Sequence, residues 1–136
     1  MKTYSGKCTC GISEVSISLP QNLDCYAPRA CDCDFCKSQN ISYLSDNKGT
    51  ITIKSLEPLR QIKQGSNQAI FLSCSRCSIV VGVVYMNDDI CVGAVNATML
   101  IDKLLLMPPV YISPKNLDPK EKIERWLTLW SPLNIT

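Results

Sequence analysis

Cysteine is the residue type in this chain whose spacing points most directly to chemistry. The sequence has nine cysteines, and seven of them fall into three tight clusters. The clusters are Cys8-x-Cys10, Cys31-x-Cys33-x-x-Cys36 and Cys74-x-x-Cys77. Because thiolates at such spacing can converge on one ion, seven of them are enough for one complete four-ligand zinc site and one three-ligand site. A three-ligand zinc site keeps one position open for water or substrate.

The middle cluster is the candidate catalytic centre, because its three thiolates lie within six residues and can face one metal without help from a distant segment. A thiol entering the open position would lose its proton and become a held nucleophile, and the same zinc could polarise an oxygen. Two alternatives stay open: the three thiols are metal-free and redox-active, or a fourth protein ligand closes the site. The candidates for that fourth ligand are Cys25, Cys91, Asp32 and Asp34.

Histidine is absent from the chain, which excludes a histidine general base and a mixed cysteine–histidine zinc site. Proton transfer is therefore left to carboxylates, tyrosines, water or a metal-bound group. Asp32, Asp34 and Tyr43 are the candidate relays near the middle cluster, and Asp34 is the preferred one. The cations nearest the clusters, which an anionic substrate would need, are Arg29, Lys37 and Arg76.

Composition indicates a cytoplasmic protein whose cysteines bind metal. The first residues, Met1–Lys7, lack the apolar stretch of a secretory signal, and no apolar run approaches the length of a membrane span. In a reducing compartment, clustered cysteines favour metal over disulfides. A net charge of +2, without a run of basic residues, argues against a nucleic-acid partner. We therefore expect neither nucleic acid nor membrane as a partner, while exposed strand edges leave a homodimer open.

Short strands must position these clusters within one domain that spans residues 1–136. Apolar residues alternate from Val15 to Leu19, which predicts a half-buried strand that ends at Pro20. Turn sequences at 46–49 and 86–89 predict two hairpins. The hairpin strands are 41–44 with 50–53, and 80–85 with 90–95, while residues 69–72 form a strand that leads into the last cluster. Residues 97–107 fit either a helix or a loop followed by a strand.

The end of the chain changes to a helical pattern. Asp118 followed by Pro119 is a good start signal for a helix. Apolar residues then recur at helical spacing, at Ile123, Trp126, Leu127 and Trp130. We expect a helix over about 119–130, with the tryptophans packed against the sheet. The fold class predicted from the sequence is mainly β with a C-terminal helix.

The order and spacing of the clusters resemble the glutathione-dependent formaldehyde-activating enzyme family, which is also represented by centromere protein V. The matching pieces are Gly6-Lys7-Cys8-Thr9-Cys10-Gly11, Cys31-Asp32-Cys33-Asp34-Phe35-Cys36 and Phe71-Leu72-Ser73-Cys74-Ser75-Arg76-Cys77. The resemblance covers about residues 3–112. Two positions differ from the family pattern: Asp32 stands where members usually carry His, and Ser78 stands where Gly usually follows the last cysteine.

This resemblance implies a zinc-stapled β-tent of short antiparallel sheets and two zinc ions per chain. It implies that Cys8, Cys10, Cys74 and Cys77 hold a structural zinc, and that Cys31, Cys33 and Cys36 hold a catalytic, more labile one. The implied activity is that of a carbon–sulfur lyase, in which a small thiol such as glutathione adds to, or leaves, a carbonyl carbon such as that of formaldehyde. The alternative is a non-catalytic, zinc-stabilised binding or scaffold module, because a fold does not fix a function.

Overall fold

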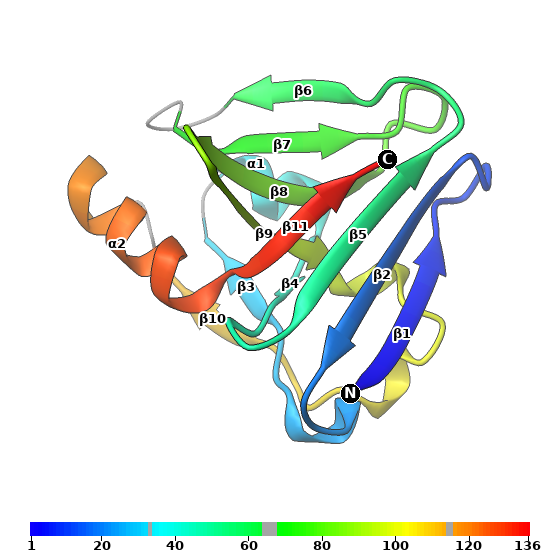
Figure 1. Ribbon diagram of the computed structural model, residues 1–136, viewed down its shortest axis with the longest axis horizontal. Helices are drawn as coiled ribbons and strands as arrows, with labels where there is room; N and C mark the ends of the chain where they lie inside the picture. The colour runs from blue at the N-terminus through cyan, green and yellow to red at the C-terminus, as the bar shows by residue number, and fades with distance from the viewer. Residues whose placement is uncertain (33, 64–67, 114–115) are drawn as a thin grey trace.

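The computed structural model describes residues 1–32, 34–63, 68–113 and 116–136, and confirms a mainly β fold with a C-terminal helix (Figure 1). Within these residues the α-helices are α1 (Asp34–Gln39) and α2 (Pro119–Leu129), and short 3-10 turns are η1 (Leu23–Cys25), η2 (Ala97–Met99) and η3 (Lys103–Leu105). The strands are β1 (Lys2–Lys7), β2 (Ser13–Leu19), β3 (Arg29–Cys31), β4 (Tyr43–Leu44), β5 (Thr50–Ser55), β6 (Arg60–Lys63), β7 (Ile70–Ser73), β8 (Val80–Asn87), β9 (Ile90–Asn96), β10 (Val110–Ile112) and β11 (Ser131–Ile135).

Strand β9 is the branching point of the sheet. One edge of β9 pairs with β8, which continues to β7 and β6. The other edge pairs with β4 at one end and with β11 at the other. From β11 the order runs on through β5 and β2 to β1, and from β4 it runs through β3 to β10. The pairs β11–β5 and β10–β3 are parallel, so the sheet is mixed and not purely antiparallel as the resemblance implied.

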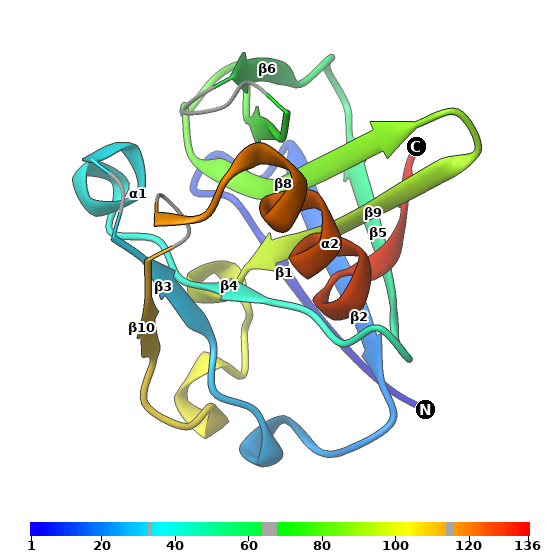
Figure 2. The same cartoon turned by 90° about the vertical axis from the view of Figure 1, so that its left-hand side faces the viewer.

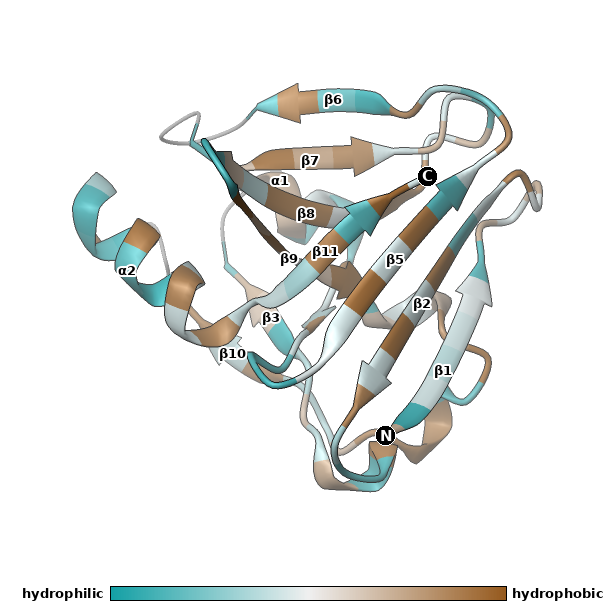
Figure 3. Cartoon of the chain, viewed as in Figure 1, coloured by the Kyte–Doolittle hydropathy of each residue, from teal (hydrophilic) through white to brown (hydrophobic). Residues whose placement is uncertain are grey.

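The main core lies between the layer β1-β2-β5-β11 and the strands β8 and β9. Side chains of β2 and β5 alternate between this core and the outer face, as the bands of hydropathy along both strands show (Figure 3). The alternation predicted for β2 is therefore confirmed, with Ile17 and Leu19 fully buried. The strands β8 and β9 supply Val81, Val84 and Val95 to the same core.

A second core covers the opposite face of β8 and β9, beneath α2 (Figure 2). The Trp126 ring lies 5.7 Å from the Tyr85 ring and stacks on Trp130 at 4.9 Å. Both tryptophans are buried, which confirms that they pack against the sheet. Because β8 and β9 are covered on both faces, their sequences are continuously apolar instead of alternating.

The C-terminal helix begins where its capping residues predict. The Asp118 carboxylate accepts from the backbone N–H of Glu121 at 2.8 Å, and the Glu121 carboxylate accepts from the N–H of Asp118 at 3.2 Å. This reciprocal pair satisfies two N–H groups that the helix leaves without partners. The helix ends at Leu129, because Trp130 is extended and the chain passes directly into β11. No helix in the described ranges is both long enough and apolar enough to cross a membrane.

One of the two predicted hairpins is present and the other is wrong. Strands β8 and β9 form the predicted hairpin, with Asn87 opposite Ile90. Strands β4 and β5 do not pair with each other, because β11 takes the edge of β5. The Ser131 hydroxyl holds β11 there: it accepts from the N–H of Asp46 at 2.9 Å and donates to its carbonyl at 2.6 Å. Residues 97–107 form the turns η2 and η3 instead of a helix or a strand.

Candidate metal centre

Four cysteines from two distant parts of the chain meet at one corner of the molecule. Cys8 and Cys10 lie at the turn between β1 and β2, and Cys74 and Cys77 at the turn between β7 and β8 (Figure 1). The Sγ atom of Cys74 lies 3.7 Å from that of Cys8 and 3.5 Å from that of Cys10. The Sγ atoms of Cys8 and Cys10 are 3.5 Å apart, and all four sulfurs lie within 4.8 Å of one another.

The two turns bend tightly enough to bring the sulfurs together. In the first turn, the N–H of Gly11 donates to the carbonyl of Cys8 at 3.0 Å, and Gly11 has a φ of 82° that favours glycine. In the second turn, the N–H of Ser78 donates to the carbonyl of Cys74 at 3.0 Å. The N–H of Ser13 also points at the Sγ of Cys8, 3.4 Å away. Spacing alone did not identify Ser13.

The pKa values of these thiols favour the binding of a cation. Burial raises the pKa of Cys74, but the backbone N–H groups of Cys77 and Arg76 outweigh it and lower the pKa to about 6. The N–H of Ile12 lowers the pKa of Cys10, yet desolvation and the neighbouring sulfurs raise it to about 11. A thiolate therefore forms readily at Cys74 at neutral pH, whereas ionisation of Cys10 beside it is costly. A bound cation would remove that cost, because metal coordination deprotonates thiols.

This sulfur geometry fits zinc. Tetrahedral zinc with Zn–S bonds of about 2.3 Å separates its sulfurs by about 3.8 Å. The three separations among Cys8, Cys10 and Cys74 are 3.5–3.7 Å, within a few tenths of an ångström of that value, and Cys77 lies within 4.8 Å of all three. Cys74 and Cys8 are buried, whereas Cys10 is exposed, so the site lies at the surface with two ligands anchored in the core. Four thiolates leave no open position, so such a site is structural.

Charged side chains beside the second turn stabilise that turn. The guanidinium of Arg76 donates to the Glu57 carboxylate at 2.7 Å, which lowers the pKa of that carboxyl. The Ser75 hydroxyl donates to the same carboxylate at 3.2 Å, and Arg60 donates to the carbonyl of Ser75 at 3.1 Å. Arg76 is therefore held in an ion pair, which makes it a poor candidate for binding an anionic substrate.

The residue after the last cysteine makes a prediction possible. Ser78 has a φ of 64°, which costs a residue with a side chain about 1–2 kcal/mol and costs glycine almost nothing. Glycine loses about 0.5–1 kcal/mol more entropy on folding. We expect Ser78→Gly to raise the free energy of unfolding of the metal-loaded protein by about 0.5–1 kcal/mol, measured by urea titration. Ser75→Gly, in the same turn but without positive φ, should lower it; an equal response of both variants would contradict the argument.

The middle cluster is described in part. Cys31 ends β3 and Cys36 lies in α1, while Cys33 lies outside the described residues, as does the side chain of Asp34. The three-thiolate site therefore stays a prediction. The side chain of Cys36 is 2% exposed and belongs to the second core, with its Sγ 3.4 Å from the Tyr43 hydroxyl. Tyr43, one of the expected proton relays, thus lies directly against a cysteine of this cluster.

Asp32, another candidate proton relay, is held by hydrogen bonds that the sequence did not indicate. The Ser113 hydroxyl donates to the Asp32 carboxylate at 2.6 Å, and the Asp32 N–H donates to the carbonyl of Ile112 at 3.1 Å, so the end of β10 and the residue after it hold Asp32 in place. Ser113 is 81 residues away in the chain, and no motif marks it.

Arg29, a candidate for binding an anionic substrate, is linked through Ser45 to the end of α2. Its guanidinium donates to the Ser45 hydroxyl, which donates to the carbonyl of Leu129 at 2.8 Å, at the C-terminal end of α2. Cations favour that end of a helix. Burial and the charge of Arg125 lower the pKa of Arg29. The third candidate, Lys37, is exposed on α1.

The two cysteines outside the clusters do not join the four-sulfur group. Cys25 is exposed beside Asp24, and Cys91 packs against the main core, where burial raises its pKa. Among the residues that the structure describes, the four-sulfur group is the one set of three or more metal-ligating side chains that converge. A role of Cys25 or Cys91 as fourth ligand of the middle cluster stays a prediction, because Cys33 of that cluster lies outside the described residues.

Comparisons with known proteins support the fold and assign no function. No protein-family model matches the chain, and no curated protein matches it. Among solved structures it is similar to the crystal structure of a Rhodobacter sphaeroides protein, with a TM-score of 0.57 and 23% sequence identity. The match covers 79% of this chain and 99% of that one. At this identity the likeness concerns the fold alone.

Proposed function

We propose that this protein is a zinc protein of the glutathione-dependent formaldehyde-activating type, with a structural and a substrate-binding zinc. The observation that carries the zinc assignment is the convergence of four sulfurs within 4.8 Å, three of them at separations close to those of a zinc tetrahedron. The structural ligands would be Cys8, Cys10, Cys74 and Cys77, and the ligands of the second ion Cys31, Cys33 and Cys36. The proposed reaction is the addition of a small thiol to a carbonyl carbon, or its reversal.

The proposed chemistry needs a thiolate, an activated carbonyl and a proton. Zinc at the middle cluster would supply a Lewis acid and favour the thiolate form of a bound thiol. Tyr43 is buried against Cys36 and carries a hydroxyl that can donate a proton to an oxygen beside the cluster. Asp32 is held by Ser113, so its carboxylate has a fixed direction. These two residues replace the histidine that this chain lacks.

A non-catalytic scaffold is the second candidate, and one observation favours it. Cys36 is 2% exposed and packs among apolar and aromatic side chains of the second core. A ligand in that setting suits a closed structural site as well as an open catalytic one. The ions of a scaffold would both be closed, and neither would respond to added thiols.

Metal stoichiometry tests the proposal. We expect about two zinc ions per purified chain by elemental analysis, and about one in Cys36→Ser. Cys25→Ser, which changes an exposed cysteine outside the clusters, should keep the wild-type metal content. One ion per chain in the wild type would contradict the second site.

A cobalt-substituted protein separates the enzyme from the scaffold. Adding glutathione should shift the cobalt absorption of the wild type and leave Cys36→Ser unchanged, because a new thiolate ligand alters the spectrum. Acceleration of formaldehyde consumption by glutathione above the uncatalysed rate should be lost in the same variant. Two ions per chain with an unchanged cobalt spectrum and no acceleration above the uncatalysed rate would leave the scaffold as the better description.

A further inference from the structure

The segment after η2 exposes an unusual amount of apolar surface. Leu104 is 92% exposed and Tyr111 is 81% exposed. Four further large apolar side chains in the same eleven residues are at least half exposed, namely Ile101, Leu105, Met107 and Val110. We call these residues, with Asp102 and Lys103, the 101–111 surface. Large apolar side chains exposed in this number within one segment of a folded domain indicate an interaction site.

This surface is held in a defined shape by backbone hydrogen bonds. Within it, the N–H of Leu105 donates to the carbonyl of Asp102 at 2.9 Å. Three further bonds tie it to the body of the molecule: Ile101 N–H to Ser5 at 3.0 Å, Met107 N–H to Tyr26 at 2.9 Å and Val110 N–H to Pro28 at 2.8 Å. Leu100 and Leu106 anchor it further by packing in or against the main core. The exposed side chains are therefore presented by a fixed backbone.

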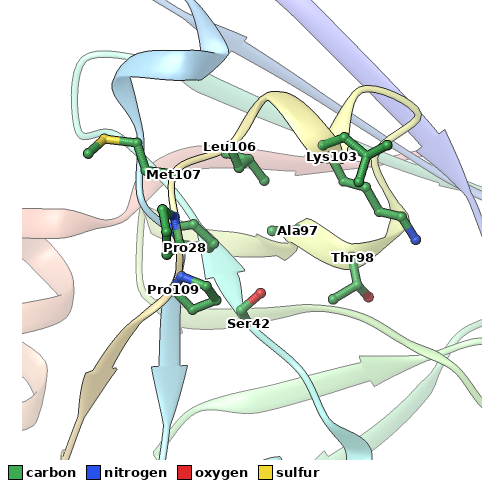
Figure 4. A pocket seen from close by; sticks show the side chains of 10 residues that line it. Pro28, Ser42, Ala97, Thr98, Lys103, Leu106, Met107 and Pro109 are labelled. Atoms are coloured by element: carbon green, nitrogen blue, oxygen red, sulfur yellow. The ribbon is translucent and has the colours of Figure 1, made fainter.

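A pocket of about 340 Å³ opens within the 101–111 surface (Figure 4). The surface itself supplies one wall, through Leu104, Met107 and the Lys103 side chain. Pro28 and Ala97 add further apolar lining, and Ser42 and Thr98 add two hydroxyls. The exposed apolar side chains of Leu104 and Met107 thus border an apolar pocket.

The charges of this surface are balanced. Asp102 and Lys103 are its charged residues, they are adjacent, and both are exposed. The ion pairs found in the described ranges are Lys7–Glu14 and Arg76–Glu57, so neither Asp102 nor Lys103 takes part in one. A surface with one charge of each sign has no net attraction for anionic lipid or nucleic acid.

We propose that the 101–111 surface is the interface of a homodimer with two-fold symmetry. In such an interface the same patch meets itself, so a residue that contacts a second residue of the partner is contacted in return. Asp102 then faces Lys103 of the partner subunit, twice across the axis, and protruding leucines of one copy enter the partner's pocket. The 101–111 surface carries exposed apolar side chains, an apolar pocket and one charge of each sign, so it can be complementary to itself. This self-complementarity favours a second copy of the chain over a different protein.

The size of the surface suits this role. Six exposed large apolar residues together with the pocket lining give an area on the order of several hundred Å² per subunit, near the roughly 800 Å² per partner of a standard interface. We therefore expect a dimer that dissociates at low concentration. Sedimentation of the metal-loaded, full-length protein over a concentration series measures its dissociation constant.

Substitution of the most exposed leucine tests the apolar contact. Leu104→Glu is expected to raise the dimer dissociation constant at least 100-fold, because two carboxylates would be brought together where two leucines were buried. The matched control is Leu56→Glu: Leu56 is 85% exposed but lies between β5 and β6, outside the surface. A wild type that is monomeric at all concentrations, or an equal effect of both variants, would overturn the proposal.

A charge exchange tests the two-fold pairing separately. Asp102→Lys should weaken the dimer about tenfold or more, because it places lysines against lysines. The double variant Asp102→Lys/Lys103→Asp should restore the wild-type dissociation constant, since the opposite charges again meet across the axis. A double variant that stays as weak as the single one would overturn the pairing. Zinc content and circular dichroism, compared with the wild type, show that each variant is folded.

Discussion

A Cys74→Ala variant is expected to lose its zinc and its folded state together. Cys74 is fully buried, and its sulfur lies within 3.7 Å of two other sulfurs of the metal centre. Structural zinc contributes about 10–16 kcal/mol of apparent binding free energy in zinc-finger peptides. The whole stability of a domain is about 5–15 kcal/mol, so the loss of this site should leave the chain largely unfolded at room temperature.

Tryptophan fluorescence and zinc content measure this result. Trp126 and Trp130 stack in the second core and report its loss. The control is Cys25→Ala, which removes an exposed thiol outside the clusters and should change the free energy of unfolding by less than about 0.5 kcal/mol. A strong chelator should act on the wild type as the Cys74 substitution does. A Cys74→Ala protein as stable as the zinc-loaded wild type would show that the site does not hold the fold together.

Gly6→Ala is expected to destabilise the protein by about 3 kcal/mol or more. A Cβ atom at Gly6 would lie 1.9 Å from the backbone oxygen of Met99 and 2.9 Å from the Cα of Leu100. These are backbone atoms at the point where β1 bridges to Leu100, so relief requires the two segments to separate. Overpacking of a tight core costs about 1–3 kcal/mol even where side chains can move.

Gly11→Ala is the matched control, because it isolates the conformational cost of losing a glycine. Gly11 has a positive φ, but a Cβ there would meet nothing within 4 Å. Its substitution should cost about 1–2 kcal/mol, from backbone strain alone. Urea unfolding of both zinc-loaded variants makes the comparison. If Gly6→Ala cost no more than Gly11→Ala, the close approach of β1 to Met99 would be wrong.

Features set by neighbouring residues were predictable from the sequence. The alternation in β2, the start of α2 at Asp118 and the β8–β9 hairpin each depend on a few adjacent side chains and a turn. The predicted hairpin of 41–44 with 50–53 failed because a strand more than 75 residues further along inserts beside β5. A local turn signal cannot exclude a distant competitor for the same strand edge.

The candidate site was likewise predictable from the sequence only where it depends on neighbouring residues. Spacing marked each cysteine cluster, because ligands two or three residues apart need only a tight turn. It did not show that Cys8 meets Cys74, a contact across 66 residues, and the family resemblance was needed to imply it. Spacing also could not place Ser113 on Asp32, since one serine in a loop carries no signal of its distant partner. The ligands of the middle cluster stay predictions.

The position of β11 has a consequence for how the chain is made. This strand lies between β5 and β9 and joins the two layers of the sheet, yet it is synthesised after both. While the chain grows on the ribosome, the facing edges of β5 and β9 therefore stay without the strand that joins them. Open strand edges recruit other chains, so nascent copies on one messenger RNA are at risk of aggregating until Ser131–Ile135 emerges. Chaperones that shield such edges should bind arrested nascent chains that end before residue 131 more strongly than chains in which it has emerged.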